Sequence, residues 1–456
     1  MGLSRIIARF IEQIEPDNLP AEVVEKAKAC LLNGYGIGMG CHNTPYAPVA
    51  RQAAVAMNGI WDNNGATLLG DGRRTSVAGA ALANSALFHG RAQEDTCGAA
   101  HLGAIMIPLL TAMIEAGHDS TADLIPALVA GYEAGGLLEQ GYAQYTTPAG
   151  LRSSTVYGTI AAAAASARLL RLPVDRIEAA LSNAASFSGG LLQSFADGTD
   201  EWRYQVGVVG QTGYTATQLA RAGSVAAPHA FEGRAGLVRA LARVDCDVDA
   251  LAARLGKEWS ILRVTFKPYP VCAFNQTPVI AALALRQTLL DKGLESDSVQ
   301  KVSVSMNPYE TGYAGMDARG PFNSISGTLM SIPFCIANTL LYGEPDMHRM
   351  TSYDDPAVAA LMERIDLLSD ESVDKLCCVI GLKINGQPDL EHRQMMTVND
   401  YAYNRQQVAS LIRRVGSETS LPEALYQKLE AFVDAPDQHP ISDLLACFGG
   451  LPGARR

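Results

Sequence analysis

The sequence predicts a mainly α protein with a smaller α+β domain. Through residue 256, apolar residues recur at helical spacing in one segment after another. Between residues 257 and 397, short alternating segments rich in β-branched residues appear among the helices. Helical spacing returns from residue 398. We therefore expect a large, discontinuous all-helical domain of residues 1–256 and 398–456, and an inserted α+β domain of residues 257–397.

The individual elements follow from spacing, capping residues and turn signals. Helices are expected at residues 3–14, 20–32, 47–57, 122–133, 159–170, 211–222, 237–242, 278–292, 336–341, 404–414 and 422–433, with one more capped by Asp175. Strands are expected at residues 261–266, 301–306 and 376–384, the last before an Asn385-Gly386 hairpin turn. Residues 150–158 and 197–205 read as polar loops between helices.

Four glycines alternate with apolar residues in the segment G-Y-G-I-G-M-G, residues 34–40. In isolation this segment suggests a nucleotide-binding loop. No strand clearly precedes it, and its spacing does not match G-x-G-x-x-G. We therefore favour close helix packing.

Residues 84–108 predict a helix, a polar loop and a second helix. The loop carries Glu94, Asp95, Thr96 and His101 between two apolar segments. His101 would lie just before a helix N-terminus, where the helix dipole keeps an imidazole neutral and able to accept a proton. One interpretation is a general base in a carboxylate-binding pocket. The other is that His101 and Asp95 only cap and tether the second helix, and the residues alone favour the two equally.

Composition excludes several classes of protein. The 456-residue chain is 48% hydrophobic and 18% charged, so it can bury two or three large cores. Its net charge of −11 and its lack of a dense Lys/Arg run argue against nucleic-acid binding. An anionic substrate would therefore need a locally basic pocket.

The nine cysteines are scattered, odd in number and free of C-x-x-C spacing. This pattern argues against a zinc framework or another metal site, and it predicts a reduced, cytoplasmic protein. Residues 1–15 lack the apolar core of a signal peptide, and no segment reaches the roughly 18 apolar residues of a membrane span. We expect no membrane association.

Several segments in a fixed order carry a family resemblance. They are L-P-A-E-V-V-E-K-A-K at 19–28, A-A-L-A-N-S-A-L-F-H at 80–89, E-D-T at 94–96, the Ala-rich run at 155–170 and K-P-Y-P-V-C at 267–272. With these segments the chain resembles the MmgE/PrpD family, which includes 2-methylcitrate dehydratase, cis-aconitate decarboxylase and iminodisuccinate epimerase. The resemblance implies an all-helical domain with an α+β lid, an active site between them, a homodimer and no organic cofactor.

The resemblance assigns site residues one at a time. It implies that His101, Asp95 and Thr96 keep family positions. Elsewhere the chain departs from the family: Ala92 and Glu94 stand at aspartate positions, Arg152, Gln205 and Gln276 at histidine positions, and Trp202 at a lysine position, with Arg203 retained. Arginine does not shuttle protons near neutral pH but binds carboxylates with two donors. We therefore expect a pocket that kept anion recognition and lost part of its proton-transfer groups.

The candidate residues fall into two sets. The expected catalytic residues are His101, Asp95, Thr96, Tyr157 and Lys267. The expected substrate-binding residues are Arg152, Trp202, Arg203, Tyr204, Gln205, Cys272 and Gln276. For Tyr157, Tyr204, Lys267 and Cys272, a packing role is favoured over acid/base work.

Three functional hypotheses follow from the resemblance and these residues. The first is a cofactor-independent lyase that dehydrates or decarboxylates a small di- or tricarboxylic acid by proton abstraction next to a carboxylate. The second is an isomerase or epimerase on a similar acid, because moving one proton needs fewer groups. The third is a non-catalytic carboxylate-binding homologue. Under the first two hypotheses, we expect His101→Ala to remove turnover. We expect Arg152→Ala or Arg203→Ala to weaken substrate binding by roughly 1.5–3 kcal/mol without unfolding the protein.

Overall fold

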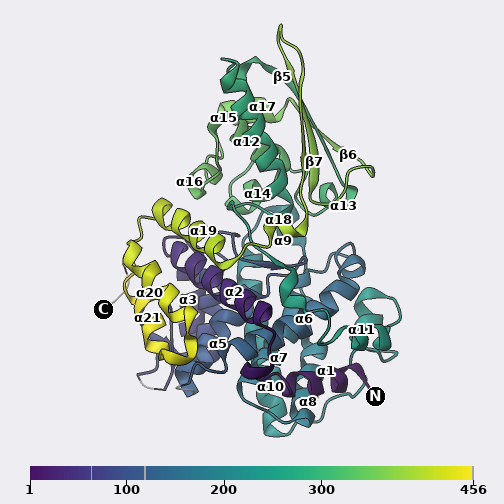
Figure 1. Ribbon diagram of the computed structural model, residues 1–456, viewed down its shortest axis with the longest axis vertical. Coiled ribbons are helices and arrows are strands. Elements are labelled where there is room, and N and C mark those ends of the chain that lie inside the picture. Colours follow the sequence, from purple (N-terminus) through teal and green to yellow (C-terminus); the bar gives the residue numbers. More distant parts are fainter. Residues whose placement is uncertain (63, 118–119, 454–456) are drawn as a thin grey trace.

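The computed structural model describes residues 1–62, 64–117 and 120–453, and it confirms the expected fold class. A helical body forms the lower part of the molecule in Figure 1, and an α+β lid stands above it. The helices of the body's N-terminal part are α1 (Leu3–Glu12), α2 (Ala21–Gly40), α3 (Tyr46–Asn58), α4 (Val77–Phe88), α5 (Gly103–Gly117), α6 (Leu124–Thr146), α7 (Ser153–Leu169), α8 (Val174–Phe187), α9 (Gln193–Asp197), α10 (Glu201–Ala222) and α11 (Val248–Arg254). A π-helical turn covers Val238–Ala242.

Helix α7 lies at the centre of the helical body. All of its residues are buried, and α6, α8 and α10 pack around it. Its alanine-rich sequence explains this position, since small side chains let neighbouring helices approach on every side. This alanine-rich helix is therefore covered on all sides within one chain.

The C-terminal tail packs on the helical body, beside α2 (Figure 1). It contains α18 (Val398–Tyr401), α19 (Arg405–Glu418), α20 (Glu423–Asp434) and α21 (Ile441–Gly449). The glycines of residues 34–40 lie inside α2, where a Cβ at Gly36 would meet Ile412 and a Cβ at Gly40 would meet Val415. This placement confirms close helix packing as the use of these glycines.

The lid is a four-stranded sheet with helices on one side. Its strands are β5 (Val299–Met306), β6 (Ile365–Ser369), β7 (Cys377–Ile384) and β8 (Leu390–Met395), in the order β6-β5-β7-β8. β5 pairs in parallel with β6, and the other two pairs are antiparallel. The lid helices are α12 (Gln276–Asp291), α13 (Pro308–Thr311), α14 (Ile325–Met330), α15 (Ile332–Tyr342), α16 (Met347–Met350) and α17 (Pro356–Met362). α12 packs on β7 and β8, and α15 packs on α12.

Several expected boundaries were wrong. The helix expected at 122–133 is α6, which runs on to Thr146 through Gly135 and Gly136, because these glycines let Ala161 and Ser260 pack closely against it. The expected polar loops at 150–158 and 197–205 are partly helical, since α7 begins at Ser153 and α10 at Glu201. Asp175 lies in the first turn of α8 and is not its N-cap. Two further two-residue strands, β1 (Ala66–Thr67) and β2 (Arg74–Thr75), pair in the body.

Candidate active site

A two-residue strand pair joins the 84–108 stretch to a distant part of the chain. β3 (Thr96–Cys97) follows α4, and β4 (Val264–Thr265) is all that forms of the strand expected at 261–266. They pair antiparallel, with Thr96 opposite Thr265 and their hydroxyl oxygens 2.7 Å apart. This pairing brings Lys267 next to Glu94.

Glu94 is the centre of a buried polar cluster. Its Oε1 atom lies 3.0 Å from each of three nitrogens: Nδ1 of His89, Nδ1 of His101 and Nζ of Lys267. His89 ends α4, His101 precedes α5, and Lys267 follows β4, so the carboxylate ties three separate elements together. We call these four residues the Glu94 cluster.

The hydrogen bonds around the two imidazoles fix their tautomers. His101 Nδ1 lies 3.1 Å from the backbone carbonyl oxygen of Asp95, which can only accept, so Nδ1 carries the proton. The other ring nitrogen of a neutral His101, Nε2, then has a free lone pair. His89 Nε2 lies 2.8 Å from an Arg152 guanidinium nitrogen, which can only donate, so Nε2 of His89 is unprotonated. Both imidazoles are thereby assigned as Nδ1–H forms.

The cluster's electrostatics favour neutral imidazoles beside an ionised carboxylate. Burial lowers the pKa of His89 to about 4, although Glu94 opposes the shift. Burial, together with the charge on Lys267, holds the pKa of His101 well below its usual range. Burial opposes ionisation of Glu94, but His89, Lys267 and His101 outweigh it and hold the pKa of that carboxyl well below its usual range. His101 is therefore neutral at pH 7, as expected. The causes are burial and the charge on Lys267, whereas the sequence had suggested the dipole of the following helix.

Asp95 points away from the cluster. Its Oδ2 accepts a hydrogen bond from the Tyr132 hydroxyl, and burial raises the pKa of Asp95 to about 6. His101 is held in addition by its backbone N–H, which donates to Ser154 Oγ at 3.0 Å. Asp95 therefore positions the loop through its backbone carbonyl and its buried carboxylate.

A cavity of about 500 Å³ lies between the helical body and the lid, and we call it the main cavity. The body contributes His101, Thr96, Lys267 and Trp202 to its lining, and the lid contributes Glu310 and Lys375 among others. Most of the remaining lining is apolar or aromatic. A few polar groups converging in an otherwise apolar interdomain cavity are typical of a small-molecule site.

Six of the twelve candidate residues line the main cavity. These are His101, Thr96, Lys267, Trp202, Cys272 and Gln276. Gln276 uses its amide on backbone groups of the 269–272 turn, accepting from the Tyr269 N–H at 3.1 Å and donating to three carbonyls. Burial raises the pKa of Cys272 to about 11, so its thiol is not ionised near neutral pH.

The two arginines do not lie where a carboxylate clamp would need them. Arg152 is buried and donates to the Trp202 carbonyl oxygen at 2.5 Å and to Gln205 at 3.0 Å. Arg203 is buried between the rings of Tyr46 and Trp202, with its guanidinium carbon 3.9 Å from each centroid. Neither lines the main cavity, and the expectation that they line a cleft is corrected. Both guanidinium groups instead contact Trp202, Arg152 through the Trp202 carbonyl and Arg203 through the Trp202 ring.

Four other candidates also lie outside the cavity lining. Asp95 lies behind the loop, and Gln205 is held between Arg152 and the Leu191 carbonyl. Tyr157 is buried with its hydroxyl 2.9 Å from that of Thr146. Tyr204 packs beside α3 and α4 in a small separate hydrophobic cluster.

Sequence reasoning named Glu94 in the loop but not as a site residue, and it missed His89 and the lid residues Tyr309, Glu310 and Tyr313. His89 ends the A-A-L-A-N-S-A-L-F-H segment, so the motif itself was a signal for it. The lid residues Tyr309, Glu310 and Tyr313 had no such signal, because their position depends on how the lid meets the body.

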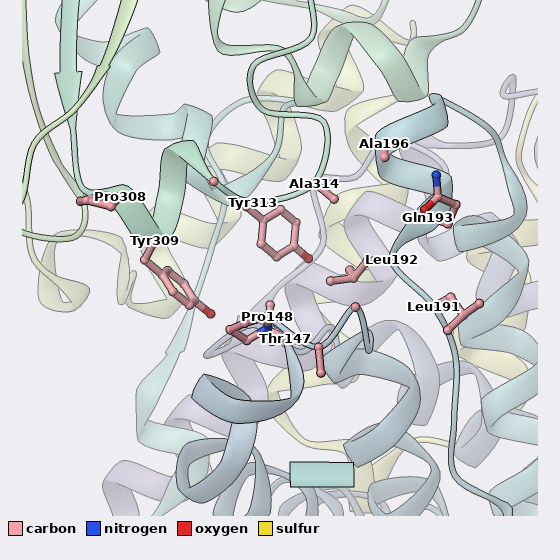
Figure 2. A pocket seen from close by; sticks show the side chains of 13 residues that line it. Thr147, Pro148, Leu191, Leu192, Gln193, Ala196, Pro308, Tyr309, Tyr313 and Ala314 are labelled. Atoms are coloured by element: carbon pink, nitrogen blue, oxygen red, sulfur yellow. The ribbon is translucent and has the colours of Figure 1, made fainter. Parts of the chain in front are cut away.

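A second cavity of about 500 Å³ lies beside the first, and we call it the side cavity. Figure 2 shows its lining, with the rings of Tyr309 and Tyr313 standing near Thr147, Pro148 and Leu192. Both tyrosines also line the main cavity, so they form the wall between the two spaces.

Within residues 1–62, 64–117 and 120–453, no group of three His, Cys, Asp or Glu side chains is arranged to hold a metal ion. In the same ranges no helix combines the length and apolarity needed to cross a membrane.

Comparison with known proteins gives a consistent assignment. The chain is 24% identical over 470 residues to a cis-aconitate decarboxylase-like protein, oryM, of Aspergillus oryzae, covering 97% of this chain and 96% of that protein. It is 24% identical over 395 residues to a cis-aconitate decarboxylase of Aspergillus terreus, covering 82% and 80% of the two chains. The MmgE/PrpD N-terminal domain matches residues 5–246, and the MmgE/PrpD C-terminal domain matches residues 269–384. The chain belongs to the MmgE/PrpD family.

Proposed function

We propose that this protein is a lyase that acts on a small di- or tricarboxylic acid, with His101 as the base that removes a proton from the carbon next to a carboxylate. The family and the relatives support a lyase-type reaction on a carboxylic acid at a coarse level. The observation that carries the finer proposal is the state of His101. It is a neutral imidazole with an unprotonated Nε2, held by Asp95 and Ser154, in the lining of the main cavity.

The Glu94 cluster supplies what a general base needs. A base must be unprotonated at the working pH and held in one orientation within reach of the proton it takes. The pKa of His101, well below its usual range, meets the first condition. The contacts of Nδ1 with the Asp95 carbonyl and with Glu94 Oε1 meet the second, and the nearby carboxylate stabilises the imidazolium that forms.

Lys267, next to the base, is our candidate for holding the substrate's carboxylate, and Arg263 is a second cation in the same lining. Nζ of Lys267 lies 3.0 Å from Glu94, and the lysine side chain also lines the main cavity. An ammonium there lowers the energy of the negative charge that develops on a carboxylate when the neighbouring carbon loses its proton. In the lyase reaction the freed electron pair then forms a double bond as the leaving group departs.

Proton NMR in deuterated water tests the proposal. The purified protein is incubated with 2-methylcitrate and, separately, with cis-aconitate as probe acids. We expect loss of the probe signals and a new product from one of them. Deuterium next to a carboxylate with no net product would favour an isomerase instead. A thermal shift with neither exchange nor product would favour a non-catalytic binder.

A further inference from the structure

Glu310 reaches the main cavity from the lid, whereas His101 reaches it from the helical body. It lies in α13, and only 1% of its surface is exposed. Asn307 caps this short helix, accepting from the Tyr309 N–H at 3.1 Å and donating to the Val373 carbonyl at 2.9 Å. The carboxyl group is therefore presented by an anchored segment.

The two oxygens of Glu310 have different surroundings. Oε1 accepts a hydrogen bond from the Leu376 N–H at 2.8 Å. Oε2 is buried and has no hydrogen-bond partner among the residues that the structure describes. A buried carboxyl oxygen without a partner is costly if it is ionised, and much less so if it carries a proton that a ligand can accept.

The groups facing Glu310 leave it close to half-protonated at neutral pH. Burial raises the pKa of Glu310 to about 7, while the Leu376 N–H and the charge on Lys375 act in the opposite direction. Tyr309, Cys272 and Cys378 also lie nearby, and burial raises the pKa of each above its usual range, so they add no charge at this pH. Lys375 is thus the charged neighbour that matters.

A lyase also needs a proton donor, and the sequence has lost the expected ones. Trp202 and Gln276 stand where the family resemblance implies a lysine and a histidine, and neither side chain can deliver a proton. Arg152 stands at another histidine position, outside the cavity lining and with a pKa that burial lowers only to about 10.

Glu139 also lines the cavity from the body, but its oxygens are taken by the Ala99 N–H at 2.8 Å and by Arg263 at 2.8 Å, and Lys267 is paired with Glu94. Of the two carboxyl groups in the lining, Glu310 is the one with an oxygen that has no partner among the described residues.

We propose that Glu310 is the proton donor of this site, acting through Oε2 from the lid, opposite the base His101. This inference rests on the proposed function. In a dehydration, His101 Nε2 takes the proton from carbon, the C–H electron pair becomes the new double bond, and the C–O bond breaks. The leaving oxygen takes the proton of Glu310 and departs as water. In a decarboxylation the C–C bond breaks, carbon dioxide leaves, and the remaining carbanion takes that same proton.

Glu310→Gln is the test variant, and Glu133→Gln is its matched control. The glutamine keeps an oxygen for the Leu376 N–H and leaves an amide in place of Oε2–H, so the fold is retained. Glu133 is also buried, and burial also raises its pKa to about 7, but both of its oxygens accept backbone N–H groups and it does not line the cavity. Its variant controls for the loss of a buried, titrating carboxyl.

The first readout needs no substrate. Infrared spectra on either side of about pH 7 should show a protonated carboxyl band that Glu310→Gln removes, with a separate component lost in Glu133→Gln. A band unchanged by Glu310→Gln would mean that Glu310 is ionised throughout, and it would overturn the proposal whether or not a substrate is in hand.

The second readout is turnover of 2-methylcitrate in deuterated water. We expect Glu310→Gln to lose roughly 10²–10⁴-fold in kcat, the usual contribution of a general acid, while deuterium exchange next to the carboxylate continues. The wild-type rate should fall as pH rises through about 7, because Glu310 loses its proton there. This decrease should be absent from the pH–rate profile of the variant. Unchanged kcat and pH profile in an active protein would overturn the role of Glu310 and leave that of His101 standing. Loss of exchange along with turnover would equally overturn a role confined to the donor step.

Discussion

The two imidazoles that contact Glu94 have their tautomers fixed by other groups, and burial keeps both of them neutral. Because Arg152 occupies Nε2 of His89 and the Asp95 carbonyl occupies Nδ1 of His101, each imidazole has one defined tautomer. His89 is fully buried and lines neither the main cavity nor the side cavity, so we assign it the role of orienting Glu94. A neutral, buried histidine of this kind carries a stability cost in acid, since the unfolded chain takes up a proton more readily.

His89→Gln tests this cost. The folded pKa of about 4 lies below the unfolded value of roughly 6.5, so the unfolded state binds more protons between these pH values and stability falls as pH falls. Glu133 and Glu310, with raised pKa values, titrate in the opposite sense, so only the difference between variant and wild type is informative. Urea denaturation should show the difference in unfolding free energy shifting in favour of the variant by roughly 3 kcal/mol from pH 6.5 to pH 4. A constant difference would contradict the assignment.

His101, Thr96 and Lys267 could be placed near the site from the sequence, whereas the arginines could not. The direction of a guanidinium depends on its partners, and those of Arg203 include Tyr46 and Ser326 from distant elements. Trp202 could be recognised as a departure from the family, but not as the residue around which both arginines pack.

Arg203→Ala should therefore lower stability. The change removes the stacking on Tyr46 and Trp202 and the 2.8 Å hydrogen bond to Ser326, at a cost of roughly 2–3 kcal/mol. Urea denaturation measures it, with the exposed Arg221→Ala on the same helix as a control that changes stability by less than about 0.5 kcal/mol. Equal stability in the two variants would return Arg203 to the list of ligand-binding candidates.

At the scale of elements, most of the long helices were predictable, whereas many short helices and the strand pair that builds the site were not. Long helices such as α2 and α12 repeat the helical spacing of apolar residues over several turns, so the sequence pattern identifies them. β3 and β4 have two residues each and pair across about 170 positions, so no local pattern reveals them. The first half of the expected strand at 261–266 belongs to a 3₁₀ turn, Ser260–Arg263, and β4 follows it.

The packing of α2 on the tail gives a prediction about Gly36. A methyl group there would meet Ile412 of α19, so Gly36→Ala should destabilise the protein by roughly 1–3 kcal/mol. Gly449→Ala, near the end of α21, meets no atom within 4 Å and should be neutral or slightly stabilising. Thermal unfolding of the two variants compares them directly. A stable Gly36→Ala protein would mean that α2 and α19 are not in close contact.

At the scale of the whole molecule, composition predicted the fold class but not the cavity. The helical body and the lid each have a hydrophobic core, with Phe266 in the first and Tyr269 in the second. The cavity lining depends on how the two parts meet, so Glu310 and the wall of Tyr309 and Tyr313 could not be read from either part alone. The division at residues 256/257 and 397/398 stays a prediction.

The homodimer also stays a prediction. The apolar helix α7 gives no support for it, because one chain buries that helix completely. α3 and α10 both pack on α4 and leave Val49, Met57 and Val208 about half exposed or more, so this surface is our candidate interface. Light scattering should give twice the chain mass of 48.4 kDa, and Val208→Glu should reduce it. A wild-type protein at 48.4 kDa would contradict the dimer.

Substitution of His101 tests the central claim most directly. His101→Asn keeps a side-chain N–H for the Asp95 carbonyl and removes Nε2. His42→Asn is the matched control, because His42 Nδ1 also lies 3.1 Å from a backbone carbonyl, that of Met39, outside the cavity lining. The measurement is deuterium incorporation next to the carboxylate of 2-methylcitrate or cis-aconitate, with calorimetry for binding. We predict that His101→Asn binds the probe but incorporates no deuterium, while His42→Asn matches wild type. Full incorporation in His101→Asn would contradict the assignment of His101 as the base.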